Sequence, residues 1–321
     1  MSSVVHRRNF LAASAAAGAA AWLAKSPLAF ATSADDRPAW KGAMIGKPDE
    51  GTLTRLKEAG FDGIESNDRH AAIDDAEAAK KLAESLGMRI HSVLYGWANF
   101  NTDSINADVE SVAKSLETAA AYGADALLLV PCRIGGMPMP QPWEFQLEFD
   151  PKTNHLIRVV EGDNGPYEAY ITAHNHAIDA SRKAIEKLIP HAEKTGVVVA
   201  LENVWNNLWV KPAHFANFVK SFDHPKVQTY YDVGNHVKYA PPQEWIKALG
   251  TSIVKIHIKD FALNPDGHGG KFVHPRDGSV DWPAVHDLLV DIGYDGWLTI
   301  EDGGLELTEF RRRLDLIIAG K

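Results

Sequence analysis

Four short, mostly apolar runs in the second half of the chain each end on a side chain that can bind a metal ion. A continuous apolar run of this kind is typical of a strand buried on both faces of a parallel sheet. The steps between the four end residues are 30, 25 and 44 residues, which leaves room for a returning helix each time. The runs are 197–201, 227–231, 252–256 and 296–300, and they lead into Glu202, Asp232, His257 and Glu301.

These four residues provide three carboxylates and one imidazole. Such an oxygen-rich donor set suits Mn²⁺, Mg²⁺ or Co²⁺ better than structural Zn²⁺, which prefers sulfur and nitrogen, although Zn²⁺ stays possible. We expect one divalent ion, with Mn²⁺ as the first choice. The alternative is four solvated polar groups without an ion, and it leaves the repulsion among three crowded carboxylates uncompensated.

The rest of the chain is organised as strands that alternate with helices. Apolar residues recur at helical spacing in segments that often end on a glycine, and short strand-like runs lie between these segments. Eight such pairs predict a (β/α)8 TIM barrel, whose active site lies at the carboxyl ends of the strands. Strands are expected at 43–46, 61–65, 88–93, 126–130 and the four runs above, and helices at 50–59, 74–86, 106–122, 168–195, 212–221, 242–249, 281–292 and 305–319.

An insertion at residues 131–169 follows the fourth expected strand. It is rich in proline and aromatic residues, and two alternating patches, 144–149 and 155–160, predict a β-hairpin. A connection this long inside a compact domain is usually functional or disordered. We expect a lid or a wall beside the active site, and an oligomer contact is the alternative.

The first 31 residues have the pattern of a twin-arginine signal peptide. Arg7 and Arg8 precede an alanine-rich apolar run, and residues 29–31 form an A-x-A cleavage site. The run is short for a bilayer span, and a retained membrane anchor is the alternative. We therefore expect the twin-arginine machinery to export the protein to the periplasm. Residues 32–40 are expected to form a polar lead-in, and residues 41–321 the catalytic domain.

Composition limits the remaining possibilities. A chain of 321 residues with 45% hydrophobic content can bury the core of one large domain. The formal charge of −9 does not suit a nucleic-acid binder, which needs a concentrated basic surface. Cys132 is the single cysteine, so an intrachain disulfide is excluded and a small buried hydrophobe is expected there. A homo-oligomer stays possible.

Five motifs, GFDGIES, LENVWNN, YYDVGN, KIHIKD and GWLTIED, resemble in this order the xylose-isomerase-like TIM-barrel superfamily of sugar isomerases and epimerases. The resemblance covers residues 41–318 apart from the insertion. In relatives of this kind, residues at the ends of strands 5 to 8 bind one divalent metal, and the two glutamates exchange a proton on opposite faces of the substrate. The resemblance implies the metal role for Glu202, Asp232, His257 and Glu301, and the catalytic role for the two glutamates.

One position departs from that pattern. Many ketose epimerases carry Asp-x-x-His after strand 6, and the histidine contacts substrate. This chain has Asn235 at that position and His236 one residue later. Both are expected near the substrate, but which of them contacts the sugar stays open.

Further substrate contacts are expected from polar and aromatic residues near the strand ends. Glu65 is a sugar contact or the partner of a nearby cation, and His91 is a sugar contact or a rim histidine. The mixture after Glu202 suits sugar recognition. The glycine- and histidine-rich segment 267–276 is either a cationic cover of the mouth or a solvated loop. The candidates from these segments are Asn203, Trp205, Asn207, Lys259 and Arg276.

These observations favour an enzyme acting on a small carbohydrate. The first hypothesis is an isomerase or epimerase of a non-phosphorylated keto sugar that works by proton abstraction next to the carbonyl. The second is a lyase or hydratase that eliminates the anomeric substituent of a 3-keto-glycoside at the same site. A non-catalytic sugar-binding protein is a third class, and the complete ligand set argues against it. An endonuclease IV-like activity on DNA conflicts with the negative charge.

Overall fold

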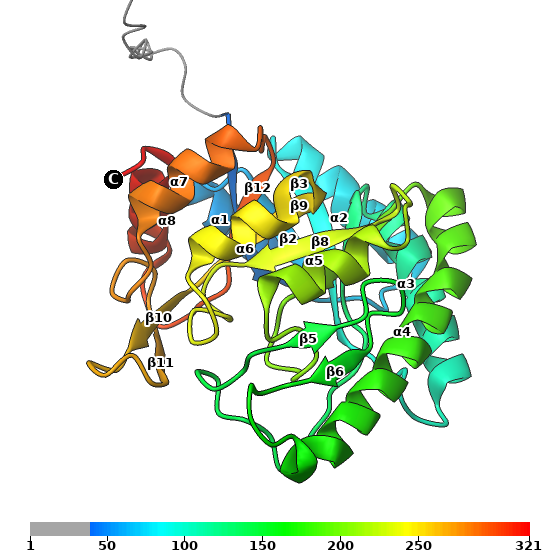
Figure 1. The fold of residues 1–321 in the computed structure, drawn as a ribbon. Coiled ribbons are helices and arrows are strands. Elements are labelled where there is room, and N and C mark those ends of the chain that lie inside the picture. The colour runs from blue at the N-terminus through cyan, green and yellow to red at the C-terminus, as the bar shows by residue number, and fades with distance from the viewer. Residues whose placement is uncertain (1–38) are drawn as a thin grey trace, which may run out of the picture. The chain divides into compact units, whose positions relative to one another are not determined.

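The computed structural model describes residues 39–321 of the chain, so the expected signal peptide at 1–31 and most of the lead-in lie outside the described residues. Parallel strands close into a barrel in the order β1–β2–β3–β4–β7–β8–β9–β12, and the helices surround it (Figure 1). The predicted (β/α)8 barrel is confirmed. Its strands are β1 (Lys41–Gly46), β2 (Gly63–Ser66), β3 (Arg89–Trp97), β4 (Ala126–Val130), β7 (Val198–Glu202), β8 (Val227–Asp232), β9 (Ile253–Ile258) and β12 (Trp297–Ile300).

Each barrel strand is followed by one of the helices that the sequence pattern predicts. Local signals set their ends: Asp281 accepts a hydrogen bond from Ala284 N at the start of α7, and Gly196 ends α4 with a φ of 77°. The bounds differ from the expected ranges by at most two residues. The helices are α1 (Glu50–Glu58), α2 (Ile73–Ser85), α3 (Ile105–Ala121), α4 (Glu168–Thr195), α5 (Pro212–Lys220), α6 (Pro242–Leu249), α7 (Trp282–Asp291) and α8 (Leu307–Ile318).

The two faces of β4 belong to different hydrophobic cores. In β4, Leu127 and Leu129 belong to the large core that also contains the helices, whereas Ala126 and Leu128 belong to a small separate cluster with Tyr230. This division follows from the two-residue period of a strand. The small cluster fills the barrel interior, so the polar site lies toward the carboxyl ends of the strands.

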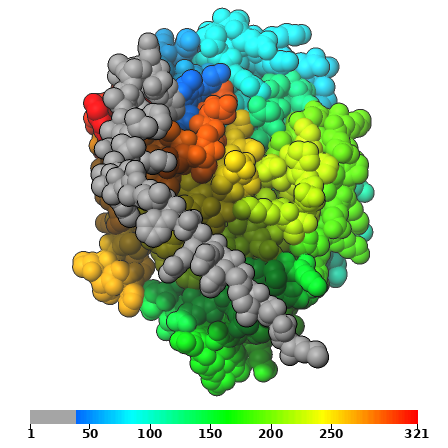
Figure 2. Space-filling model, turned by 45° about the horizontal axis from the view of Figure 1, so that its top comes forward, coloured from blue at the N-terminus to red at the C-terminus, as the bar shows by residue number. Residues whose placement is uncertain are grey.

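Two hairpins project on the same side of the barrel (Figures 1 and 2). The predicted hairpin of the insertion is present but shorter than expected, as β5 (Glu148–Phe149) and β6 (Leu156–Arg158). A second hairpin, β10 (Asp260–Leu263) with β11 (Gly270–Val273), was not predicted, because its strands are short and joined by a glycine-rich turn. The rings of Trp143 and His268 stack with centroids 4.3 Å apart, so the insertion contacts the turn of the second hairpin.

The boundary of the domain lies before the expected residue 41. Trp40 is 5% exposed, and its indole nitrogen donates a hydrogen bond to Tyr294 O at 2.6 Å. Trp40 therefore belongs to the barrel and not to a polar lead-in. Among residues 39–321, the structure contains no helix long and apolar enough to cross a membrane.

Candidate metal centre

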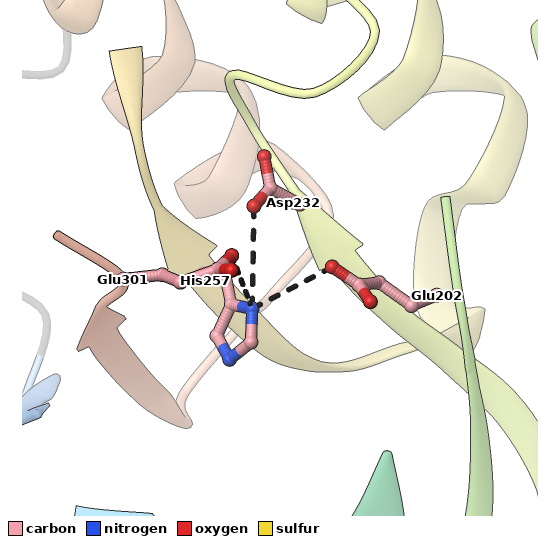
Figure 3. A group of neighbouring side chains, drawn as sticks. All are labelled: Glu202, Asp232, His257 and Glu301. Carbon is pink, nitrogen blue, oxygen red and sulfur yellow. Dashed lines mark ion pairs between the residues drawn. The ribbon is translucent and has the colours of Figure 1, made fainter. Parts of the chain in front are cut away.

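The four strand-end residues converge as the sequence predicts (Figure 3). One ligand atom from each side chain can be chosen so that all lie within 4.8 Å of one another. His257 Nδ1 lies 3.1 Å from Glu301 Oε2, 3.7 Å from Glu202 Oε1 and 4.0 Å from Asp232 Oδ2. Strand register accounts for this arrangement, because Asp232 of β8 is paired with His257 of β9.

The unsatisfied atoms of this cluster fit one divalent cation. Asp232 Oδ2, His257 Nδ1 and Glu301 Oε2 are buried and accept or donate no hydrogen bond within the part of the chain that the structure describes. A metal about 2.1 Å from each ligand places adjacent ligand atoms about 3 Å apart and opposite ones about 4.2 Å apart. The observed distances of 3.1 to 4.0 Å lie in this range. The cluster is therefore able to hold a metal ion.

Electrostatics point the same way. Burial, followed by repulsion from the Glu301 carboxylate, raises the pKa of Asp232 well above its usual value. Burial also raises the pKa of Glu202. For Glu301, burial is outweighed by His257 and Lys259, and its pKa is lowered. The cluster thus contains more buried negative charge than its neighbours neutralise, and a divalent cation would relieve this excess.

Glu65 holds the histidine of the cluster in place. Its Oε2 accepts hydrogen bonds from His257 Nε2 at 2.7 Å and from Tyr230 OH at 2.8 Å, and all three side chains are buried. Because a carboxylate only accepts, Nε2 carries a proton, and Nδ1 is the ring nitrogen that faces the cluster. Of the two expected roles of Glu65, sugar contact or partner of a nearby cation, its pairing with His257 supports the second, and the carboxylate positions the imidazole. Sequence reasoning missed Tyr230, which belongs to the barrel-filling cluster.

His91 is not at the mouth, which corrects the expected substrate contact. It is the third residue of β3, which continues to Trp97 instead of ending at residue 93 as expected. Six residues of the strand therefore separate His91 from the carboxyl end. The ring is fully buried, stacks on Trp297 with centroids 4.4 Å apart, and its Nε2 is hydrogen-bonded to Thr299 Oγ1 at 3.0 Å. Burial lowers the pKa of His91 well below its usual value, so the ring is neutral. It serves the packing of the barrel interior.

Two asparagines that were expected to contact the sugar form hydrogen bonds with backbone groups instead. Asn203 donates from Nδ2 to Asp232 O at 2.8 Å, and its Oδ1 accepts from Asp232 N at 2.7 Å. Asn207 has a φ of 61° and donates from Nδ2 to Ile134 O at 2.6 Å. The first amide fixes the end of β8, and the second fixes the start of the insertion.

The structure connects Asn235 and Lys259 directly to the cluster. Asn235 Nδ2 donates to Glu202 Oε1 at 3.1 Å, and Lys259 Nζ lies 3.0 Å from Glu301 Oε1. The indole nitrogen of Trp205 donates to Asn235 O, so this ring is connected to the site through Asn235. Each of the two candidate catalytic glutamates therefore has its own polar partner.

His236 and Arg276 do not reach the cluster by any hydrogen bond or ion pair within residues 39–321. His236 is 2% exposed and packs against Trp245, with ring centroids 4.7 Å apart. Arg276 is exposed, and its backbone N donates to Asp260 Oδ2 at 2.9 Å. The expected substrate role of these two side chains has no contact to support it.

Asp260 shapes the loop between β11 and α7. Besides Arg276 N, its carboxylate accepts hydrogen bonds from Gly278 N at 3.2 Å and from the Trp282 indole at 3.1 Å. The loop passes so close that a Cβ on Gly278 would lie 2.1 Å from Asp260 Oδ1. Only glycine fits this approach without a rearrangement.

A closed parallel barrel with a metal-capable cluster at the carboxyl ends of its strands defines a TIM-barrel protein with a candidate metal centre. A model of the family described as Xylose isomerase-like TIM barrel matches residues 53–315, and the chain belongs to that family.

Solved structures share this fold at low sequence identity. A Xylose isomerase domain protein from Planctomyces limnophilus has a TM-score of 0.64 at 18% identity, over 88% of this chain and 97% of that one. A D-tagatose 3-epimerase-like protein has a TM-score of 0.65 at 17% identity, over 87% of this chain and 97% of that one. The 3-keto-D-glucoside 4-epimerase from E. coli has a TM-score of 0.63 at 16% identity, over 87% of this chain and 99% of that one. An uncharacterized protein of Methanocaldococcus jannaschii is 25% identical over 131 residues, 39% of this chain and 43% of that protein, so the match spans less than half of it.

Proposed function

We propose that this protein is a divalent-metal-dependent isomerase or epimerase that moves a proton next to the carbonyl of a non-phosphorylated keto sugar. The observation that carries the proposal is the buried cluster in which Glu202 and Glu301 face each other across His257 (Figure 3). The epimerases among the structurally similar proteins support it, as does the family. Mn²⁺ is the expected ion.

The chemistry follows from the positions of the two glutamates. A bound divalent ion would polarise the carbonyl and stabilise the negative charge that develops when the neighbouring carbon loses its proton. Glu202 ends β7 and Glu301 follows β12, with β8 and β9 between these strands in the barrel. One carboxylate takes the proton and the other returns it on the opposite face of a planar intermediate. Asn235 and Lys259 hold the two carboxylates in orientation.

The proposed location is the periplasm, reached through the twin-arginine pattern in residues 1–31. Phosphorylated sugars are scarce outside the cytoplasm, which supports a non-phosphorylated substrate.

Deuterium exchange tests the proposed reaction. The Mn²⁺-loaded protein is incubated with free ketoses in D₂O, and carbon-bound deuterium and new epimers are followed by NMR. Glu202→Gln and Glu301→Gln should each slow exchange by about 10²–10⁴-fold, whereas Glu117→Gln, which removes an exposed carboxylate paired with Lys194, should leave it unchanged. A metal-loaded protein that exchanges no ketose would refute the proposal.

A second candidate is elimination of the anomeric substituent from a 3-keto-glycoside. The observation that favours it is a cavity of about 350 Å³ beside Glu301, lined in part by Phe272 and Val273, which gives room for a group beyond one sugar ring. A structurally similar protein is described as acting on a 3-keto-D-glucoside. Release of the aglycone from a 3-keto-glucoside, without formation of an epimer, would establish this candidate in place of the first.

A further inference from the structure

The cavity beside the cluster has walls of two kinds. The hairpin contributes Phe272 and Val273, which are apolar, and Phe272 is 41% exposed. The strand ends contribute Lys259 and Glu301, which belong to the candidate metal centre. A volume of about 350 Å³ lies within the usual range of about 300–1,000 Å³ for small-molecule sites. A sugar bound at the cluster therefore has this cavity directly beside it.

A histidine–aspartate pair completes the lining of the cavity. His274 Nδ1 lies 2.7 Å from Asp302 Oδ2, and the two side chains are 36% and 21% exposed. Asp302 directly follows Glu301, so the pair adjoins the cluster in sequence as well as in space. His274 Nε2 makes no hydrogen bond within residues 39–321.

Holding one ring nitrogen on a carboxylate fixes the orientation of an imidazole and leaves the other nitrogen available for proton transfer. His274 Nδ1 is the nitrogen that is held, so Nε2 is the one available to a group in the cavity. No step of the proton transfer between Glu202 and Glu301 uses this pair. It is therefore an acid–base pair that the isomerase reaction leaves unused.

We propose that this cavity receives the anomeric substituent of a 3-keto-glycoside, and that His274 Nε2 protonates the departing oxygen. This inference rests on the elimination candidate for the same site. A carboxylate of the cluster takes the proton from the carbon between the ketone and the anomeric carbon. The electron pair forms the carbon–carbon double bond, the anomeric C–O bond breaks, and the oxygen takes the proton of His274 to leave as an alcohol. The products are an enone and the free alcohol, and His274 regains its proton from solvent.

The dependence on the leaving group tests this role. Two 3-keto-β-glucosides are compared with the Mn²⁺-loaded protein, one that releases 4-nitrophenol and one that releases methanol. His274→Asn keeps an amide able to donate to Asp302 but removes Nε2. Because methoxide is a poor leaving group, its release should fall by about 10²–10⁴-fold, while release of 4-nitrophenol, which leaves readily as an anion, should fall less than about tenfold. Deuterium exchange at the carbon between the ketone and the anomeric carbon of these glucosides should be unchanged.

The matched control is His155→Asn. This histidine also lies 2.7 Å from an aspartate, Asp179, and is 34% exposed, but its partner is on α4. The control should behave as wild type. His274→Gln is a second variant, and the melting temperature and Mn²⁺ affinity of each variant show that it is folded and loaded.

Each outcome decides the matter. An equal loss with both glucosides and in deuterium exchange assigns His274 a structural role and overturns the inference, as does an equal loss in the His155 control. A wild type that exchanges deuterium into ketoses but releases no alcohol overturns the inference and leaves the isomerase proposal standing. A wild type that does neither overturns both.

Discussion

Replacing Glu65 with glutamine should weaken metal binding without removing any metal ligand. The carboxylate is fully buried and faces His257 Nε2 at 2.7 Å, while Nδ1 of the same ring faces the three other carboxylates. Glutamine keeps the size and one acceptor oxygen but removes the negative charge behind the imidazole. The ring then becomes a poorer donor, and its orientation loses its charged partner.

The magnitude follows from what is lost. Loss of a group that orients a metal-ligating histidine typically lowers metal affinity about 10–100-fold, which is about 1.4–2.7 kcal/mol of binding free energy. Competition with a fluorescent chelator measures the Mn²⁺ dissociation constant of wild type and of Glu65→Gln. Circular dichroism checks that the variant is folded.

Tyr230→Phe is the matched control, because it removes the other hydrogen bond to Glu65 Oε2 and keeps the charge. It should lower the free energy of unfolding by about 1 kcal/mol and change Mn²⁺ affinity less than Glu65→Gln does. If Glu65→Gln bound Mn²⁺ as tightly as wild type, or if both variants lost affinity equally, the positioning role of the carboxylate would be wrong.

Three further predictions concern stability. Mn²⁺ at about 100 times its dissociation constant should add about 2.7 kcal/mol to the free energy of unfolding; a melting temperature that is the same with Mn²⁺ and with EDTA would contradict a metal centre. Gly278→Ala should cost about 1–3 kcal/mol in urea unfolding because its Cβ would meet Asp260, whereas Gly162→Ala, with open space around it, should be nearly neutral. Burial lowers the pKa of His174 to about 3 and of His214 to about 4, so the unfolded state binds more protons below about pH 6.5 and stability falls as the pH drops. Each histidine should lower the free energy of unfolding by about 2 kcal/mol between pH 7 and pH 5. His174→Gln or His214→Asn should make the free energy of unfolding depend less on pH. An unchanged slope in either variant would show that these histidines do not cause the loss.

The sequence was sufficient to predict the barrel and the four converging residues because both depend on patterns that are local in the chain. Glu202 and Asp232 end their apolar strands and Glu301 directly follows one, and parallel neighbours place such ends together. The β10–β11 hairpin was missed because four-residue strands around glycines leave no comparable pattern. Its position beside Glu301 nevertheless forms one wall of the cavity.

The roles of the remaining candidates could not be predicted, because they depend on which atoms meet across the barrel. His91 was expected at a strand end, but β3 continues to Trp97 and leaves the ring inside. Asn203 is a residue type that often binds sugars, yet the nitrogen and the oxygen of its side-chain amide both form hydrogen bonds with the backbone of Asp232. A polar residue beside a ligand has two possible partners, substrate and backbone, and only the three-dimensional register distinguishes them.

The position of Glu65 shows how the barrel interior contributes to the chemistry at the mouth. Burial disfavours a charged imidazole, but Glu65, followed by Glu202 and Glu301, raises the pKa of His257 well above its usual value. In the protein without metal, the imidazole therefore carries a second proton, on Nδ1, and its positive charge partly neutralises the surrounding carboxylates. A divalent ion that binds at Nδ1 must displace that proton, so binding should release protons to the solvent. The carboxylate that favours the proton also strengthens the imidazole as a ligand, and Glu65 consequently affects both the affinity for the metal and its dependence on pH.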